Sequence, residues 1–306
     1  DFFPDHLVTE ARQDIQDLFQ DLGITPVMVG EADTKLGSVE TYEHAKICAD
    51  LFKKHQDEID GVLVVLPNFG DEKGVADTIK LSGLDVPILV QAYPDDLDAF
   101  DVVRRRDAYC GKISVCNNLR QYGYKFTLTE LHTSSPKSDS FKADLQKFVR
   151  VCRVVRGLNS ARLGAIGARP TAFNTVRFSE KLLQASGITV STIDLSEVFG
   201  AAGKLADDDA LVKDKLSTIK AYAKHDSVPH PLVVRMAKLG IVISDWMDKN
   251  DLDASALQCW TSLQENYGVN ACTLMSMMSD QMMPSACEVD ITGVVSMYAL
   301  QLASGF

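Results

Sequence analysis

The stretch GVLVVLPNFGDEKG, residues 61–74, decides how this chain folds. Its apolar residues form a continuous, largely β-branched run that ends in a turn, and they do not alternate with polar ones. A continuous run indicates a strand whose two faces are both covered, as in a parallel sheet between layers of helices. Helical spacing follows through Ile79 and Lys80, and a second continuous run, VPILVQAYP, occupies residues 86–94. The sequence therefore predicts a doubly wound α/β domain.

The same alternation extends toward the N-terminus. Residues 7–23 and 42–60 have the spacing of amphipathic helices, and the first of them closes on Gly23, a residue type that often ends helices. Residues 24–30, ITPVMVG, lie between them and are strand-like. We therefore place one α/β domain at residues 1–135.

The strand and helix pattern is repeated in the second half of the chain. The segment HTSSPKSDS, residues 132–140, is small, polar and interrupted by a proline, which makes it the best linker candidate. After it we predict strands at 162–170, 188–196, 255–260 and 285–289, and helices at 141–158, 174–187, 207–224, 230–249, 262–280 and 292–303. We therefore predict two Rossmann-like, doubly wound parallel-sheet domains in tandem, the second at residues 136–306.

The charge balance excludes the classes of partner that need a basic surface. The chain has 31 Lys and Arg against 42 Asp and Glu, which gives a formal net charge of −11. The one basic cluster in the sequence is the short run 104–106, so a nucleic acid would meet net repulsion. No apolar run reaches the ~18 residues of a membrane span. We therefore expect neither a nucleic acid nor a membrane as partner.

The cysteine, histidine and glycine patterns argue against three further kinds of site. The seven cysteines are scattered and form no CxxC pair, which is typical of reduced thiols in a cytoplasmic protein. The six histidines show no HxH or HExxH spacing. The segment GAIGARP, residues 164–170, falls short of the G-x-G-x-x-G that a dinucleotide needs. The sequence thus predicts a cytoplasmic protein without a disulfide framework, a histidine metal site or a nucleotide fingerprint.

Polar side chains stand just after the predicted strands of the second domain. Arg169 follows the first strand, Gln258 and Trp260 end the third, and Glu288 and Asp290 follow the fourth. Ligands of open parallel sheets bind beyond the carboxyl ends of the strands. Acids and amides can hydrogen-bond hydroxyl groups, while an aromatic ring can stack on a sugar face. These residues therefore form a candidate site for a polyhydroxylated ligand.

Each of these residues also has a purely structural interpretation. Asp290 precedes a predicted helix, where Asp is a favoured N-cap. The negative charge of Glu288 would be stabilised by the positive end of the same helix dipole. Gln258 and Trp260 could be a strand end that packs into the core. Arg169 could be a surface charge at a helix start. From the residues alone, both interpretations stay open.

Five motifs together resemble one known family. They are VLPNFGDE, CGKISVCNNLRQYG, IGARPTAFNTVRFSEKLL, LQCWTSLQENYG and PSACEVDITGVVSMYALQLASG. These segments run across essentially the whole chain and are similar to the L-fucose isomerase-like group, which is related to L-fucose and L-arabinose isomerases. The resemblance implies two α/β domains followed by a C-terminal domain rich in β structure. It also implies a homotrimer or homohexamer that converts aldoses to ketoses with a divalent metal, usually manganese.

The resemblance assigns roles to single residues. It makes Glu288 a metal ligand and a candidate acid/base, and it places Gln258 in the substrate region. The family's second metal carboxylate and its metal-binding histidine lie farther along, in or near the third domain, so residues 1–306 are expected to hold only part of the metal site. The segment DFFPDHL, residues 1–7, resembles the region just after the family's first strand. We therefore expect that first strand and the C-terminal domain to lie outside this sequence.

Sugar isomerisation requires a carboxylate that transfers a proton, a role that an acid at the end of the fourth predicted strand of the second domain could fill. A proton leaves the carbon next to the carbonyl, an enediol forms, and a carboxylate returns the proton to the neighbouring carbon. A divalent cation that chelates both oxygens stabilises the enediolate, and hard oxygen ligands suit Mn²⁺ or Mg²⁺. Glu288 and Asp290 are two residues apart, so on an extended backbone both would point toward one ion. We predict Glu288 as catalytic residue and metal ligand, and Asp290 as a helix cap or a support for that ligand.

Three functions remain in view. We predict a metal-dependent aldose–ketose isomerase that acts on an L-fucose- or L-arabinose-like monosaccharide, with Arg169, Gln258 and Trp260 as substrate contacts. The alternative is a non-catalytic sugar-binding protein, because two doubly wound domains that face a cleft also describe sugar receptors. A nucleotide-dependent enzyme is third, and the missing glycine fingerprint disfavours it.

Overall fold

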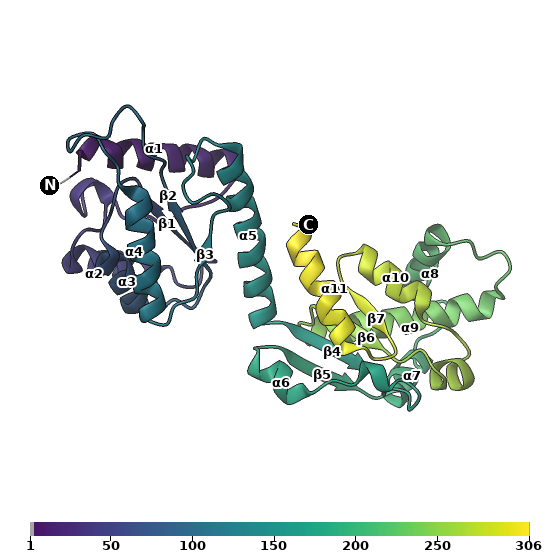
Figure 1. Cartoon of the computed structure of the whole chain (residues 1–306). Coiled ribbons are helices and arrows are strands. Elements are labelled where there is room, and N and C mark those ends of the chain that lie inside the picture. The colour runs from purple at the N-terminus through teal and green to yellow at the C-terminus, as the bar shows by residue number, and fades with distance from the viewer. Residues whose placement is uncertain (1–2, 306) are drawn as a thin grey trace. The chain divides into compact units, whose positions relative to one another are not determined.

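A computed structural model gives the structure of the chain and describes residues 3–305 (Figure 1). The chain divides into two compact units, Asp1–Val155 and Arg156–Phe306. Each unit holds one parallel sheet, of three strands in the first and four in the second, and helices flank both sheets. The predicted α/β class with two parallel sheets is therefore confirmed.

The first sheet is built from the two continuous apolar runs. Strands β1 (Val62–Leu66) and β2 (Ile88–Ala92) pair in parallel over their whole length. The short β3 (Thr127–Leu128) pairs with β2 on its other side. Every residue of β2 is buried, as expected for a central strand that is covered on both faces.

Helices cover both faces of this sheet. They are α1 (Asp5–Leu22), α2 (Tyr42–Lys54), α3 (Glu72–Ser82), α4 (Ala108–Gln121) and α5 (Asp139–Asn159). Successive residues of a strand point to opposite faces. Leu89 of β2 clusters with residues of α1 and α5, including Phe141. Its neighbour Val90 clusters with α3 and α4, including Ile79 and Val115. The first unit therefore has a core on each side of its sheet.

One predicted strand does not form in the first unit. Residues 24–30, all of them described, contain no strand and lead from α1 toward the short 3-10 helix η1 (Lys35–Gly37). Pro26 has no backbone N–H to donate to a ladder, and Val29 alone among these residues is buried. The apolar spacing of this segment thus reflects packing of Ile24, Met28 and Val29 against the protein rather than a position in the sheet.

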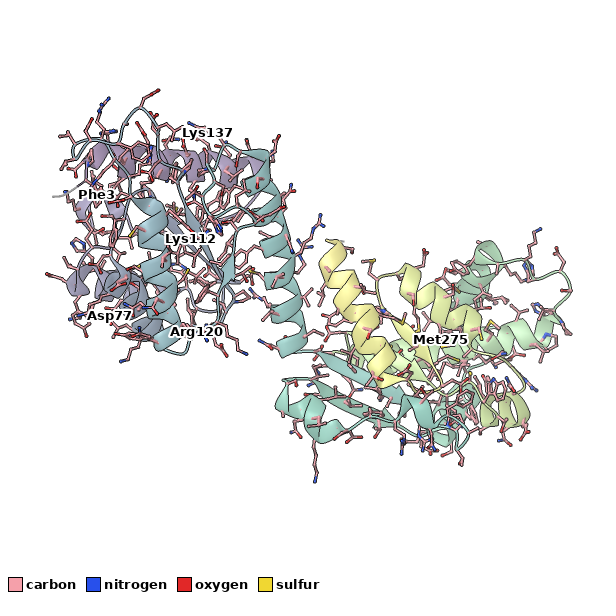
Figure 2. The ribbon with its side chains drawn as sticks, in the orientation of Figure 1. Phe3, Asp77, Lys112, Arg120, Lys137 and Met275 are labelled. Atoms are coloured by element: carbon pink, nitrogen blue, oxygen red, sulfur yellow. The ribbon has the colours of Figure 1, made fainter. Side chains whose placement is uncertain are left out.

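The predicted linker, residues 132–140, is bonded to the first sheet. The buried Gln91 donates from Nε2 to the carbonyl oxygen of Ser134 at 2.6 Å. The buried Lys112, labelled in Figure 2, donates from Nζ to a backbone carbonyl of the same segment at 2.9 Å. These bonds keep the segment with the first unit. The two compact units meet between Val155 and Arg156, inside α5.

The second sheet has the strand order β5-β4-β6-β7, and all its pairs are parallel. The strands are β4 (Arg162–Ile166), β5 (Thr189–Ile193), β6 (Ala254–Leu257) and β7 (Ser285–Cys287). The chain runs from β4 to β5 on one side and later places β6 on the other side of β4. The switch point therefore lies between the carboxyl ends of β4 and β6, where ligands of open α/β sheets bind.

Helices also cover both faces of the second sheet. They are α6 (Glu180–Ala185), α7 (Leu195–Gly203), α8 (Ala210–Tyr222), α9 (His230–Lys249), α10 (Cys272–Asp280) and α11 (Ile291–Ser304). Ile166 and Leu257 cluster with residues of α7 to α10. Ala165 and Ala256 cluster on the other face with Ile291 of α11. Within the described part of the chain, every helix is too short or too polar to traverse a bilayer.

Local breaks divide two of the predicted helices of this unit. Residues 174–187 form the 3-10 helix η2 (Asn174–Val176) followed by α6. Residues 262–280 form the π-helical turn η3 (Leu263–Tyr267) followed by α10. Helix α7 is absent from the sequence-based prediction, although Asp194 at its start is a typical N-cap residue that caps it here. These differences shorten the helices without changing the order of the strands.

Gly111 of α4 lets the loop after β1 approach the helix, and it generates a stability prediction. A Cβ atom at this position would overlap the carbonyl oxygen of Phe69. We predict that Gly111→Ala lowers the free energy of unfolding of the first unit by about 1–3 kcal/mol, because overpacking a close backbone contact forces the chain to shift.

The matched control is Ile113→Ala, a change at an exposed position of the same helix that should alter stability by less than about 0.5 kcal/mol. Denaturant unfolding followed by far-UV circular dichroism measures both variants. Tryptophan fluorescence provides an internal reference, because Trp246 and Trp260 both lie in the second unit. Equal unfolding midpoints for the two variants would contradict the assigned packing of Gly111.

Candidate functional site

A pocket of about 400 Å³ opens at the carboxyl edge of the second sheet, beside the switch point. Segments that follow three strands line it: Gly167 and Ala168 after β4, Asp194, Leu195, Ser196 and Phe199 after β5, and Gln258, Ser262 and Asn266 after β6. Of the predicted substrate contacts, Gln258 lines the pocket. Arg169 and Trp260 are not among its described lining residues. Amide, hydroxyl and carboxylate groups beside apolar ones suit a polyhydroxylated ligand.

Gln258 bridges the ends of β4 and β6. Its Oε1 accepts a hydrogen bond from the Ala168 amide at 2.8 Å, and its Nε2 donates to the carbonyl oxygen of Trp260 at 2.9 Å. Gly167 makes this bridge possible, because it has φ +85° and a Cβ atom there would lie 2.6 Å from Gln258 Oε1. The side-chain amide is therefore held in one orientation at the pocket wall.

Arg169 and Trp260 meet through the loop that follows β4. Arg169 donates from one guanidinium nitrogen to the carbonyl oxygens of Pro170 at 2.9 Å and Phe173 at 3.2 Å. The Phe173 ring packs edge-on against Trp260, with ring centroids 5.7 Å apart. Trp260 is 51% exposed, so its indole is not a core residue. Arg169 thus holds a loop against an accessible aromatic surface.

Glu288 lies where the chain turns from β7 into α11. Glu288 has φ +60° and Val289 has φ +56°, two left-handed residues in succession. A β-branched residue rarely adopts this conformation, and such strain persists only where packing enforces it. Val289 is only 3% exposed, and it belongs to the cluster that contains Ile291 of α11. The buried valine therefore fixes the turn that aims the Glu288 carboxylate.

The Glu288 side chain points to two thiols rather than to a second acid. Its Oε1 accepts a hydrogen bond from Cys259 Sγ at 2.8 Å and lies 3.5 Å from Cys287 Sγ. The two sulfur atoms are 2.7 Å apart. Glu288 Oε2 is buried and finds no hydrogen-bond partner among residues 3–305. One carboxylate oxygen is therefore held, and the other has unused capacity to bind.

Burial controls the protonation of the two thiols. It raises the pKa of the Cys259 thiol, and the hydrogen bonds with Cys287 and Glu288 raise it further. Burial also raises the pKa of the Cys287 thiol. Both groups are consequently protonated at neutral pH and can act as donors, with the carboxylate as the acceptor at the end of the chain of bonds.

Asp290 caps α11 and does not belong to the described group of Cys259, Cys287 and Glu288. Its Oδ1 accepts hydrogen bonds from the Gly293 amide at 2.8 Å and from the Thr292 hydroxyl at 2.9 Å. The expectation that Glu288 and Asp290 point toward one ion assumed an extended backbone. The left-handed residues replace that backbone with a tight turn, so the structure does not bring the two acids together.

Cys259 and Cys287 are the site residues that sequence reasoning missed. Together with Glu288 they form a group whose potential ligand atoms lie within 4.8 Å of one another. A signal was available, because each cysteine directly adjoins a predicted site residue at the end of a predicted strand. The scattered spacing of the cysteines concealed the pair, since the two strand ends become neighbours only through the pairing of β6 with β7.

Residues 1–159 match the family described as "Fucose/sulfoquinovose isomerase, N-terminal domain". The chain belongs to this family. The predicted resemblance to L-fucose isomerase-like proteins is thereby confirmed. The matched region ends at the last residue of α5, close to the end of the first compact unit at Val155.

Curated relatives of this fucose/sulfoquinovose isomerase family member are described as sulfoquinovose isomerases. The chain is 26% identical over 204 residues to that of Priestia aryabhattai, which is 66% of this chain and 44% of the relative. It is 24% identical over 200 residues to that of a Clostridium sp. (strain MSTE9), which is 63% of this chain and 43% of the relative. The chain thus spans less than half the length of these relatives.

Gly167 generates a prediction about the bridge between β4 and β6. We predict that Gly167→Ala lowers the free energy of unfolding of the second unit by about 2 kcal/mol or more, because an alanine is strained at positive φ and its Cβ would displace Gln258. The matched control is Gly200→Ala in α7, where no atom lies within 4 Å and φ is ordinary.

The control should raise stability by about 0.5–1 kcal/mol, since alanine is the better helix former. Tryptophan fluorescence during denaturant unfolding measures both changes in the second unit. An unchanged midpoint for Gly167→Ala would show that Gln258 does not depend on this close approach.

Proposed function

We propose that this chain forms part of an aldose–ketose isomerase in which Glu288 carries the proton between adjacent sugar carbons. Membership of the fucose/sulfoquinovose isomerase family supports the reaction class. The observation that carries the role of Glu288 is its orphaned Oε2, a buried carboxylate oxygen beyond the end of β7. Such an oxygen has unused capacity to accept a proton, although Glu288 is not among the described residues that line the pocket.

The contacts of Glu288 suit a proton carrier. The carboxylate takes a proton from carbon 2 of the open-chain aldose, and the electron pair of that bond moves to give the enediolate. The hydroxyl proton of oxygen 2 moves to oxygen 1, and return of the carbon-bound proton to carbon 1 then gives the ketose. The Cys259 thiol holds Oε1 at 2.8 Å, which fixes the carboxylate while Oε2 reacts. Because the turn at Val289 also restrains it, little side-chain freedom has to be lost in the reaction.

A divalent cation is part of this proposal, with Glu288 as one of its ligands. The cation would supply charge stabilisation for the enediolate oxygens. Mn²⁺ and Mg²⁺, the ions that the resemblance implies, prefer oxygen ligands. In the group formed by Cys259, Cys287 and Glu288, Glu288 offers oxygen and the two cysteines offer sulfur. The described donor set therefore does not fit a hard cation without further oxygen ligands.

For the substrate we propose a six-carbon aldose related to sulfoquinovose or L-fucose. Curated relatives are named for sulfoquinovose, which carries a sulfonate at carbon 6. The described lining of the pocket includes no lysine or arginine to pair with a sulfonate. We therefore propose that Gln258 contacts the hydroxyl-bearing part of the sugar and that Trp260 stacks on its face. Arg169 would position Gln258 and Trp260 through the loop that follows β4. A homotrimer or homohexamer is proposed as the assembly.

The role of Glu288 generates an activity prediction for the full-length natural protein. We expect Glu288→Gln to lower the rate of proton exchange and ketose formation by about 10²- to 10⁴-fold, the usual contribution of an acid/base group. Asp290→Asn is the matched control, because asparagine also caps helices and the residue lies outside the proposed chemistry. It should retain most of the activity.

Deuterium incorporation at carbon 2 in D₂O, followed by NMR, measures proton transfer directly, and the substrates are sulfoquinovose, L-fucose and L-arabinose. Wild-type exchange rates in Glu288→Gln would refute its assigned role. Sugar binding by the wild-type protein without exchange on any of these sugars would favour the sugar-binding alternative.

A further inference from the structure

We propose that Cys259, Cys287 and Glu288 form a binding site for a thiophilic divalent cation such as Zn²⁺ or Cd²⁺. The three groups come from the ends of two paired strands, β6 and β7, and from the left-handed turn after β7. Their ligand atoms lie within 4.8 Å of one another. This site shares Glu288 with the proposed isomerase, but it is defined by the sulfur atoms and does not require that the isomerase proposal be correct.

Hydrogen bonds already align the three groups toward a common point. Cys287 Sγ donates to Cys259 Sγ at 2.7 Å, and Cys259 Sγ donates to Glu288 Oε1 at 2.8 Å. A divalent cation that enters replaces the two thiol protons, which pass to solvent. The two thiolates neutralise its two positive charges, and the carboxylate leaves the site with one net negative charge. Metal binding by thiols proceeds through this loss of protons.

The distances require only a small adjustment. Zinc binds thiolate sulfur at about 2.3 Å, so two sulfur ligands in tetrahedral geometry lie about 3.8 Å apart. The two sulfur atoms would therefore have to separate by about 1 Å from their present 2.7 Å. Rotation about the Cα–Cβ bonds can provide this, because Cys259 lies two residues past the end of β6 and is not held in the strand ladder.

The ligand types select the cation. Thiolates prefer soft or borderline ions such as Zn²⁺ and Cd²⁺ and bind Mg²⁺ or Mn²⁺ poorly. Three protein ligands leave a fourth position open, which is the arrangement of zinc sites that also bind a small molecule. The orphaned Glu288 Oε2 independently indicates a ligand at this corner, because it is a buried acceptor that no described residue satisfies.

The test is a titration of the reduced full-length protein with Cd²⁺, followed by the ultraviolet charge-transfer absorption of cadmium–thiolate bonds. We expect one ion per chain, and we expect Cys259→Ser and Cys287→Ser each to abolish the band. Glu288→Gln should weaken binding by about tenfold or more, since even indirect partners of a metal contribute that much. Cys272→Ser, at an exposed cysteine outside the group, is the matched control and should bind normally.

A second measurement needs no variant. In the unmodified protein, Zn²⁺ should slow alkylation of Cys259 and Cys287 by at least about tenfold, as peptide mass spectrometry would report, while Cys272 reacts at an unchanged rate. Mg²⁺ should protect neither residue. The proposal is overturned if Cd²⁺ gives no band with the wild-type protein, if the band survives loss of both cysteines, or if Zn²⁺ leaves their alkylation unchanged. These outcomes can be interpreted even if the protein shows no isomerase activity, because none of them depends on sugar turnover.

Discussion

The turn at Glu288 and Val289 is the constraint on which the rest of the site depends. Two non-glycine residues in the left-handed conformation cost about 1–2 kcal/mol each. Burial of the valine side chain contributes about 1.5–3 kcal/mol, which is of the size needed to offset that strain. The chain can then pass from β7 into α11 without an intervening loop, and the carboxylate is directed toward the end of β6 instead of into solvent.

Consecutive residues beyond β6 connect that strand end to both of its neighbours. Gln258 bonds to the Ala168 amide in the loop after β4, whereas Cys259 bonds to Glu288 after β7. The pocket wall and the thiol–carboxylate group are therefore coupled through one short segment. A change in the backbone at Gln258 or Cys259 would therefore disturb both the pocket wall and the thiol–carboxylate group. The end of β6 is thus the part of the sheet edge on which both sites depend.

Much of this arrangement follows from sequence patterns, and the exceptions have identifiable physical causes. The runs at 62–66 and 88–92 predict strands of a parallel sheet, because a continuous apolar run indicates a strand that is covered on both faces. The segment 24–30 has similar apolar character, but Pro26 removes a ladder donor. The pairing of the two cysteines was beyond local reasoning, because it depends on which strands become neighbours. The direction of Glu288 depends on a left-handed valine, which no propensity favours.

The two oxygens of Glu288 separate the two kinds of chemistry assigned to it. Oε1 contacts both thiols, so any ion that binds Oε1 would also have sulfur ligands. Oε2 has no partner among the described residues, and leaving a buried acceptor unsatisfied costs about 1–3 kcal/mol. That cost is recovered when a proton, a hydroxyl group or a cation reaches Oε2. A soft ion on the sulfur side and a sugar on the Oε2 side therefore need not compete for the same atom, although each changes the charge that the other meets.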